Sequence, residues 1–194
     1  MLAVEGAANV PLDLGFEAGL ETPFGLRVFG GYGWVVAPYV SWLRGASVSE
    51  GSARVVIDEA DASGHVLRLK LGIRPFRRLG LYLDAGYGRA DLDGALNLTG
   101  SVAELGSLSG GYGVHSALDL LLVELGYQVK VENRLILALG LGFTGTLNSS
   151  TTITPAGATI GSSSLDVAEA AVDRVFERYG FVPTLNLRVG FNVL

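Results

Sequence analysis

The sequence predicts an all-β protein: an up-and-down antiparallel transmembrane β-barrel of eight strands, with a short amphipathic helix before the last strand. Three observations favour this fold class. Segments of about ten residues alternate between apolar and polar side chains, the connections between them are alternately short and long, and the composition is apolar with few charges. Strict alternation is a strand pattern. Short turns at one end and long loops at the other are typical of barrels that cross a membrane.

Seven segments carry the strand pattern. The clearest runs from Leu185 to Val193, where every odd position is apolar and every even position is polar or glycine. The seven segments are residues 12–21, 25–36, 66–75, 80–90, 117–131, 134–146 and 184–193. Single-chain bacterial barrels contain an even number of strands. We therefore expect an eighth strand, either in residues 1–10 or within residues 48–58.

The connections between these segments differ in length. Short turns fall at residues 21–25, 76–79 and 131–134, whereas residues 44–64, 92–113 and 148–183 form long loops rich in Gly, Ser, Thr and Asp. In bacterial barrels the short turns face the periplasm and the long loops face outward. If that holds here, the strand at 12–21 runs toward the periplasm, and the chain would begin outside the cell.

The composition fits one barrel domain that spans residues 1–194. Hydrophobic residues make up 49% of the chain and charged residues 17%, below the quarter or so that is usual in soluble domains. The mean hydropathy is +0.41. The nearest candidate for a spanning helix, Val28 to Leu43, carries no charge but contains three glycines and Pro38, so it does not predict such a helix. The 28 glycines fit a narrow lumen crowded by larger side chains.

Several classes of function are disfavoured. The chain has no cysteine, which excludes disulfides and thiolate chemistry. The net charge of −5 argues against a nucleic-acid partner, because such partners require a basic surface. Met1 is not followed by a basic segment and an apolar core. For a secreted protein, the expectation is therefore that a signal peptide has been removed from this chain.

Charged side chains lie on the polar faces of most of the predicted strands. The predicted lumen network consists of Glu17, Glu21, Arg27, Arg68, Lys70, Arg74, Asp84, Glu124, Lys130 and Arg188. An eight-stranded barrel is just wide enough for its interior to be filled by side chains. Buried charges must then be paired or hydrated. We expect salt bridges that hold the lumen closed, with a conducting pore as the alternative.

Aromatic side chains gather near the predicted strand ends. We expect two girdles at the membrane–water interfaces, made of Phe24, Trp34, Tyr39, Trp42, Phe76 and Tyr82. The alternative is that these rings belong to the core of a soluble barrel. In that case the Leu and Val faces would point inward, and the protein would carry apolar ligands.

The third long loop contains the pattern of a helix. Ser163 to Asp166 form a capping sequence, Arg174 and Arg178 lie late in the segment, and Gly180 provides a stop. One apolar face is expected, made of Leu165, Ala168, Val172, Val175, Phe176 and Tyr179. This face could pack against the barrel rim or nearby loops, or it could form a plug, a membrane-surface helix or a partner-docking element.

Two segments carry a family resemblance. Gly72-Ile73-Arg74-Pro75-Phe76 leads through a turn into the strand from Gly80 to Gly88, and a helical segment precedes Pro183-Thr184-Leu185. In these features the chain resembles the small outer-membrane β-barrel proteins of Gram-negative bacteria, including uncharacterised outer-membrane β-barrel domain proteins. The resemblance implies location in the outer membrane and two partners, outer-membrane lipids and the barrel assembly machinery. Barrels of this kind usually end in an aromatic residue, whereas here Phe191 stands three residues before the end.

The sequence does not predict an enzyme. His115 and Ser116 are neighbours on a predicted strand, so their side chains point to opposite faces. His65 and Ser63 could share a face, but they lie in or beside a predicted loop. Recognisable spacings for a metal site, paired catalytic carboxylates or a phosphate loop are missing, and we expect no cofactor. The predicted function is a non-enzymatic outer-membrane barrel with a polar, side-chain-filled lumen and long loops for structural, interaction or small-ligand roles. The alternatives are a soluble carrier of apolar ligands and a small outer-membrane pore.

Overall fold

A computed structural model describes most of the chain. The described residues are 2–35, 47–50, 53–76, 79–102, 106–131, 134–155, 169–170, 172–174, 176–177 and 181–193. The strands are β1 (Leu2–Val10), β2 (Asp13–Glu21), β3 (Leu26–Val35), β4 (Ser47–Glu50), β5 (Ala53–Ile73), β6 (Leu81–Val102), β7 (Gly106–Val131), β8 (Leu135–Pro155) and β9 (Val182–Asn192). All of their pairings are antiparallel.

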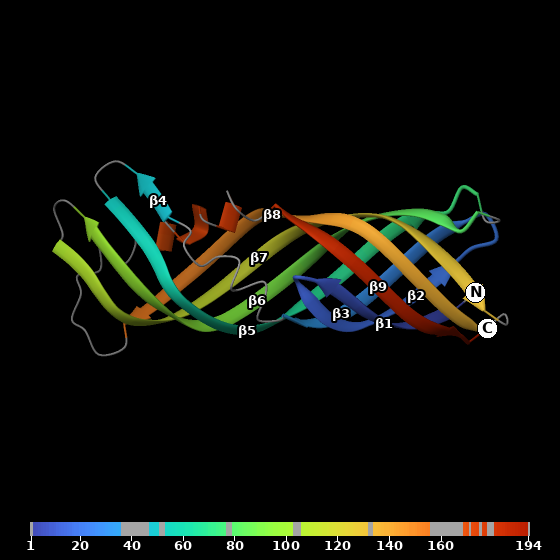
Figure 1. Ribbon diagram of the computed structural model, residues 1–194, viewed down its shortest axis with the longest axis horizontal. Helices are drawn as coiled ribbons and strands as arrows, with labels where there is room; N and C mark the ends of the chain where they lie inside the picture. The colour runs from blue at the N-terminus through green and yellow to red at the C-terminus, as the bar shows by residue number, and fades with distance from the viewer. Residues whose placement is uncertain are drawn as a thin grey trace.

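Eight of these strands close into a barrel (Figure 1). The sheet runs in the order β3-β2-β1-β9-β8-β7-β6-β5, and β3 also pairs with β5, which closes the ring. The predicted up-and-down barrel of eight strands is therefore confirmed. The eighth strand is β1, the first of the two expected positions. The other position, around residues 48–58, contributes β4 and the start of β5, and β4 pairs only with the far end of β5.

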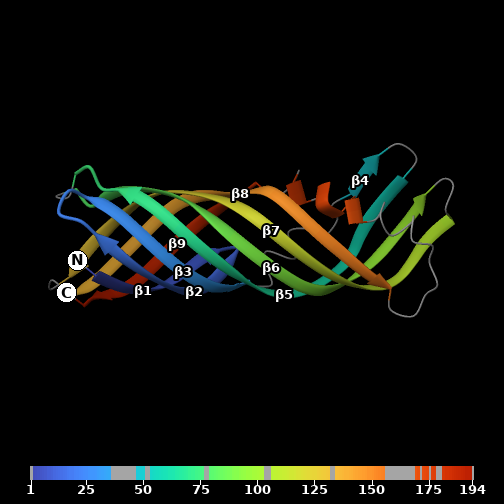
Figure 2. The same ribbon diagram turned by 180° about the vertical axis from the view of Figure 1, so that it is seen from behind.

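Four neighbouring strands are about twice as long as the rest. β5 to β8 contain 21 to 26 residues each, whereas β1, β2, β3 and β9 contain 9 to 11. The ring closes only up to the pairs Trp34–His65 and Thr144–Val182. Beyond these pairs, β5 to β8 continue as an open sheet, which we call the wall (Figures 1 and 2).

The prediction of long loops at 44–64, 92–113 and 148–183 is wrong for the parts of these segments that form the wall. Residues 53–64, 92–102, 106–113 and 148–155 are strands in the structure. The strand pattern was missed because neither face of a sheet outside the barrel has to be uniformly apolar. Beyond the ring the polarity of the two faces changes: on β6, Arg89 and Asp93 are exposed whereas Ala90 and Leu92 are buried.

The short turns and both chain ends lie at the end of the barrel opposite the wall (Figure 1). Leu2 pairs with Leu20, next to the turn that joins β2 to β3. The prediction that the chain begins at the long-loop end is therefore wrong. β1 runs from the turn end of the barrel toward the wall, and β2 runs back to the turn end.

Inward and outward side chains alternate along the barrel strands. In β9, for example, Asn186 and Arg188 are buried whereas Leu185, Leu187 and Val189 are about half exposed. The apolar faces point outward, which contradicts the alternative of a soluble carrier with Leu and Val inside. Among the described residues, helices are too short or too polar to cross a membrane.

Glycines on the inward faces make room for large polar side chains. A Cβ atom placed on Gly126 would overlap the hydroxyl group of Tyr82, and one on Gly140 would lie 2.9 Å from the same hydroxyl oxygen. A Cβ on Gly33 would overlap the carboxylate of Asp13. The lumen is therefore as crowded as the glycine content predicted.

Candidate functional site: the polar lumen

Arg188 of β9 is the centre of the lumen. Its guanidinium is 1% exposed and faces four carboxylates from four other strands. Nη2 lies 2.9 Å from Oε1 of Glu124 and 3.3 Å from Oδ2 of Asp84. Nη1 lies 3.5 Å from Oε2 of Glu17, and Nε lies 3.7 Å from Oε2 of Glu5. One side chain thus connects β9 to β1, β2, β6 and β7.

A second group of ion pairs lies nearer the wall. Arg68 donates from Nη1 to Oδ2 of Asp13 over 2.6 Å, and its Nε lies 3.2 Å from Oε1 of Glu17. The ammonium group of Lys70 lies 2.8 Å from Oε1 of Glu17 and 3.3 Å from Oε2 of Glu124. Glu17 and Glu124 also contact Arg188, so the two groups form one network.

Arg27 is held mainly by aromatic rings. Its guanidinium carbon lies 4.3 Å from the ring centre of Tyr82 and 4.6 Å from that of Phe29, distances typical of cation–π contacts. Nη1 lies 3.3 Å from Oδ1 of Asp84, yet its buried nitrogens have no hydrogen-bond partner in the described part of the chain. Arg188 contacts the same two rings. The rings therefore offer a polarisable face to both of these cations.

The turn end of the lumen carries a smaller pair. Arg74 donates from Nη1 to both carboxylate oxygens of Glu21, over 3.0 and 2.9 Å. Lys130 is exposed at the turn end of β7, where its charge acts on Glu21. The turn end of the lumen therefore carries a buried ion pair, with the exposed Lys130 beside it.

An apolar layer lies between the network and the wall. Val66, Ala90 and Leu118 are paired across β5, β6 and β7, and all three are fully buried. Leu120 and Leu122 follow on the inward face of β7 and are also buried.

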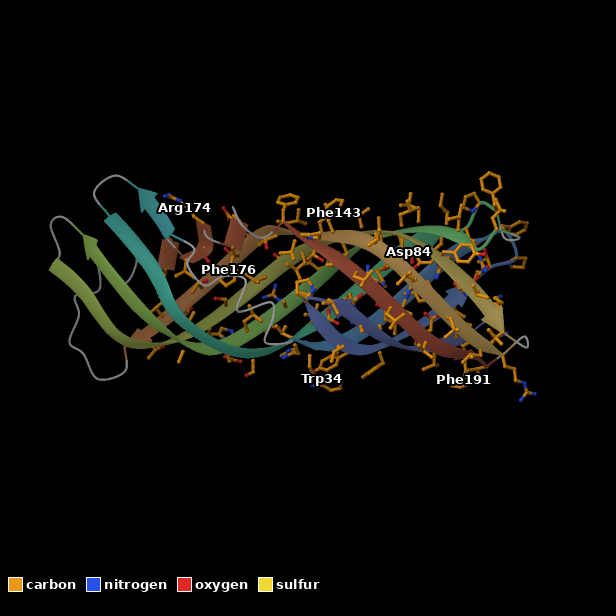
Figure 3. All side chains as sticks on the ribbon, in the orientation of Figure 1. Trp34, Asp84, Phe143, Arg174, Phe176 and Phe191 are labelled. Carbon is orange, nitrogen blue, oxygen red and sulfur yellow. The ribbon has the colours of Figure 1, made fainter. Side chains whose placement is uncertain are left out.

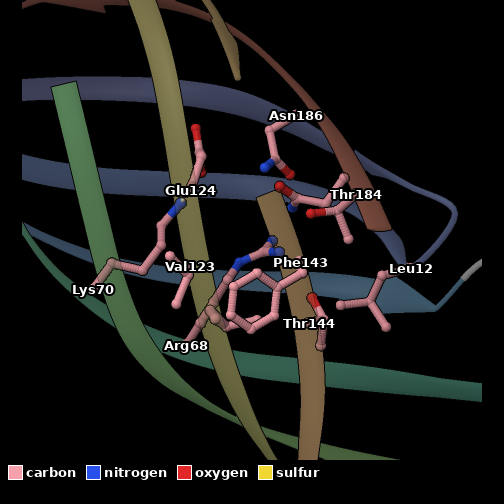
Figure 4. A pocket seen from close by; sticks show the side chains of 11 residues that line it. Leu12, Arg68, Lys70, Val123, Glu124, Phe143, Thr144, Thr184 and Asn186 are labelled. Atoms are coloured by element: carbon pink, nitrogen blue, oxygen red, sulfur yellow. Dashed lines mark hydrogen bonds and ion pairs between the residues drawn. The ribbon is translucent and has the colours of Figure 1, made fainter. Parts of the chain in front are cut away.

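A small cavity lies on the turn side of this layer. Its volume is about 20 Å³, enough for about one water molecule. Figure 4 shows its lining, which includes Arg68, Lys70, Thr144, Thr184 and Asn186. The cavity is therefore bounded by the polar network on one side and by apolar side chains on the other.

The structure brings together nine of the ten residues predicted for the lumen. Those nine are Glu17, Glu21, Arg27, Arg68, Lys70, Arg74, Asp84, Glu124 and Arg188, and each is buried. Lys130, the tenth, is exposed at the strand end. Two further acids, Glu5 and Asp13, were not predicted. Glu5 was missed because the position of the eighth strand was open. Asp13 could have been predicted, because it lies on the same face of its strand as Glu17.

The girdle prediction is wrong for Tyr82. Its ring is fully buried in the lumen, and its hydroxyl donates to Oε1 of Glu124 over 2.5 Å. Trp34 is exposed at the wall end of β3, while Phe24 and Phe76 are exposed at the turn end. Tyr39 and Trp42 lie outside the described residues. Figure 3 shows Asp84 inside the barrel and Trp34 and Phe191 pointing away from it.

The aromatic cluster on the outer surface is larger than predicted. Tyr32 lies 6.0 Å from Phe16 and 5.2 Å from Trp34, measured between ring centres. Tyr32 also stacks on His65 at 5.7 Å. The cluster lies near the end of β3, at the level where the apolar outer surface gives way to charged residues on β6 and β7, such as Arg89 and Asp119.

The two histidines lie on the outer face beside that boundary. Nε2 of His65 lies 3.5 Å from Oδ2 of Asp91, and Nδ1 of His115 lies 2.7 Å from Oδ1 of Asp93. Ser116 points to the opposite face, where it bonds Thr151. Within the described ranges, no group of three or more His, Cys, Asp or Glu side chains is arranged to hold a metal ion.

The predicted helix is present in part. Residues 169–170, 172–174 and 176–177 are helical and lie against β8 of the wall (Figure 1). Val172 and Phe176 are buried. Ser149 donates to Oδ1 of Asp173 over 2.9 Å, and the amide of Ile153 donates to Oε1 of Glu169 over 2.8 Å. The described part of the helix therefore packs against β8 of the wall. Four residues of its predicted apolar face lie outside the described residues: Leu165, Ala168, Val175 and Tyr179.

Comparisons with known proteins agree with this fold. No protein-family model matches the sequence, and no curated protein matches it. Crystal structures of Acinetobacter baumannii CarO and CarO2 each match with 15% identity and a TM-score of 0.52. The alignments cover 97% of this chain and 96% of CarO, and 98% of this chain and 97% of CarO2. A major outer membrane protein of Thermus thermophilus aligns over 98% of this chain and 97% of its own, with 13% identity and a TM-score of 0.48. CarO and CarO2 therefore share the fold of this chain.

Proposed function

We propose that this protein is a non-enzymatic barrel of a bacterial outer membrane, with a closed lumen and a wall that stands above the outer surface. The observation that carries the proposal is the inverted distribution of side chains. Six carboxylates and five cationic groups of the described residues are buried inside the barrel, while large apolar side chains of all eight barrel strands face outward. A soluble protein would gain free energy from the opposite arrangement.

The outer surface supports the membrane assignment. On all eight strands the outward positions of the turn-side half are apolar, aromatic, Ala or Gly, up to Trp34 on β3, Tyr87 on β6 and Leu121 on β7. From Leu26 to Trp34 the chain rises ~3.3 Å per residue, and a strand tilt of ~40° gives a height of about 20 Å. Phe24 in the turn extends this belt toward the ~25 Å that is usual for such barrels.

The interior supports a closed lumen. Ions would have to displace side chains that are already paired across the barrel, such as Arg188 with Glu124 and Arg68 with Asp13. The apolar layer that includes Leu118 lies across the wall end of the same path. Breaking a buried ion pair costs about 3–5 kcal/mol. Steady conductance is therefore unfavourable.

The wall is the part of the protein that is available for interactions. Long extensions of bacterial barrels face outward, which orients the short turns toward the periplasm. The outer face of β6 carries Arg89, Asp91 and Asp93. A polar, charged sheet of this kind suits a structural or recognition role. The apolar belt would contact the lipids of the outer membrane. The closing strand, which contains Phe191, would engage the barrel assembly machinery.

Gel mobility tests the membrane assignment. The purified chain is folded into detergent micelles or diluted into plain buffer, and each sample is run with and without boiling. We expect a heat-modifiable band only in detergent, because the apolar belt needs an apolar solvent. A monodisperse, folded protein in plain buffer would overturn the proposal.

A further inference from the structure

We infer that Glu5 holds a proton in the closed barrel at neutral pH, so that closing the barrel between β1 and β9 takes up one proton. These are the first and last strands of the chain, and Glu5 pairs across their seam with Gly190. The inference goes beyond the proposed function, because it concerns the interior of the barrel and does not depend on the membrane assignment. It assigns a proton-binding site to the lumen.

Glu5 has the longest ion-pair distance of the buried carboxylates. Its side chain is buried, and among the described residues its ion pair is the 3.7 Å contact between Oε2 and Nε of Arg188. The same oxygen is buried and has no hydrogen-bond partner in that part of the chain. By contrast, Asp13 and Glu124 lie 2.6 and 2.9 Å from a guanidinium nitrogen. A buried charge without a close partner is unfavourable, and a proton neutralises it instead.

A second carboxylate lies beside Glu5. Glu5 and Glu17 are directly paired across β1 and β2, and both are buried in the lumen. Like charges in this arrangement repel each other, and two carboxylates at one site favour a proton on one of them. Glu17 is the one that stays ionised, because the ammonium group of Lys70 and Nε of Arg68 lie 2.8 and 3.2 Å from its Oε1. The proton therefore belongs to Glu5.

The cations near Glu5 are engaged by other carboxylates. The charges that act on Glu5 come from four strands and belong to Arg188, Arg27, Lys70 and Glu17. Nη2 of Arg188 lies 2.9 Å from Oε1 of Glu124, and Nη1 of Arg27 lies 3.3 Å from Oδ1 of Asp84. Both arginines therefore lie closer to another carboxylate than to Glu5, as the ammonium group of Lys70 does.

The charge balance at the centre of the lumen supports the same conclusion. Apart from the pair formed by Arg74 and Glu21 at the turn end, the buried carboxylates of the described residues are Glu5, Asp13, Glu17, Asp84 and Glu124. The buried cations of the same part of the chain are Arg27, Arg68, Lys70 and Arg188. Five carboxylates thus face four cations. One proton makes this buried set neutral and removes the uncompensated charge.

Proton uptake makes closure of the barrel depend on pH. In the unfolded chain Glu5 loses its proton above about pH 4.3, whereas the closed barrel keeps it. The folded state then binds one more proton than the unfolded state. Its stability therefore falls as the pH rises from about 4.3 to the pH at which the closed barrel itself loses the proton. The variant Glu5→Gln is neutral at every pH and lacks this dependence.

Infrared spectroscopy of the full chain at neutral pH tests the inference. The protein carries isotope-labelled glutamate and is folded into a maltoside detergent, which has no carbonyl group. Exposed carboxyl groups are ionised at this pH, so the band of a protonated glutamic acid reports a buried one. The parent is compared with Glu5→Gln and with the control Glu21→Gln, which removes a buried acid that accepts two hydrogen bonds from Arg74.

We expect the band in the parent and in Glu21→Gln, and we expect none in Glu5→Gln. Absence of the band from the parent would overturn the inference, and so would a band that persists in Glu5→Gln. Because Gln resembles the neutral acid, Glu5→Gln should fold as the parent does, and its failure to fold would also count against the proton.

Urea unfolding in the same detergent provides a second readout. The folding equilibrium constant of Glu5→Gln is divided by that of the parent at several pH values between about 5 and about 7. This ratio should rise with pH by up to about tenfold per unit, whereas the ratio for Glu21→Gln should stay constant. A ratio for Glu5→Gln that does not change with pH would contradict proton uptake on closure.

Discussion

Nη2 of Arg188 donates to Oε1 of Glu124 over 2.9 Å, although the two residues are 64 positions apart and their strands are not neighbours. β8 lies between β7, which carries Glu124, and β9, which carries Arg188. The bond therefore crosses the interior of the barrel. Backbone hydrogen bonds join each strand only to its two neighbours in the sheet. Ion pairs such as Arg188–Glu124 also join strands that share no backbone hydrogen bonds.

Arg188→Met should be the most destabilising single change in the lumen. It leaves the four carboxylates around Arg188 buried with less compensating charge, which costs about 3–5 kcal/mol. Urea unfolding in lipid vesicles measures the loss. Arg89→Met is the matched control, because Arg89 is 53% exposed and its replacement should change stability by less than about 0.5 kcal/mol. Equal effects of the two variants would contradict the central role of Arg188.

Tyr82→Phe should destabilise the barrel by about 2 kcal/mol, because a hydrogen bond to the buried carboxylate of Glu124 is lost. Tyr127→Phe is the control, since Tyr127 faces outward and is half exposed. Unfolding in urea is again the measurement. If Tyr82 belonged to an interfacial girdle, both changes would have similar small effects.

Alternation placed most of the lumen residues correctly and puts Tyr82 on the same face as Asp84, yet the girdle prediction assigned Tyr82 to a membrane interface. Tyr82 is two residues from Asp84 and next to Leu81, so the rule that puts Asp84 inside also puts Tyr82 inside. Its aromatic character suggested an interface position instead. The strand period is a geometric constraint, whereas an aromatic ring is compatible with either face. Where the two signals conflict, the period decides.

Leu139→Arg should destabilise the protein in lipid by about 2–4 kcal/mol, because Leu139 lies on the outward face of β8 within the belt. Thr152→Arg places the same charge on the exposed outer face of the same strand, above the belt. It should be nearly neutral. Folding yield into vesicles compares the two variants, and similar yields would argue against a lipid-facing belt.

The extent of the wall could not be predicted from alternation. Residues 106–116 read Gly-Ser-Leu-Ser-Gly-Gly-Tyr-Gly-Val-His-Ser, which resembles a loop, yet they belong to β7. Their pairing with β6 and β8 depends on partners far along the chain. Strand length here is a tertiary property, because each extended strand is stabilised by its neighbours rather than by its own pattern.

Gly126→Ala should cost about 1–3 kcal/mol, because its new methyl group would overlap the hydroxyl of Tyr82 in a filled lumen. Gly30→Ala is a matched change on an outward position where a Cβ atom meets nothing within 4 Å. It should leave stability unchanged or slightly raised. The urea midpoints of the two variants test how tightly the lumen is packed. Equal midpoints would indicate a loosely filled interior.

Potassium efflux from proteoliposomes tests the central claim most directly. The protein is reconstituted into potassium-loaded vesicles, its incorporation is verified by flotation, and efflux is followed with a potassium electrode. A closed membrane barrel predicts protein that floats with the vesicles and efflux equal to that of protein-free vesicles. Efflux that rises with the amount of incorporated protein would contradict the closed lumen, and protein that does not float would contradict the membrane barrel itself.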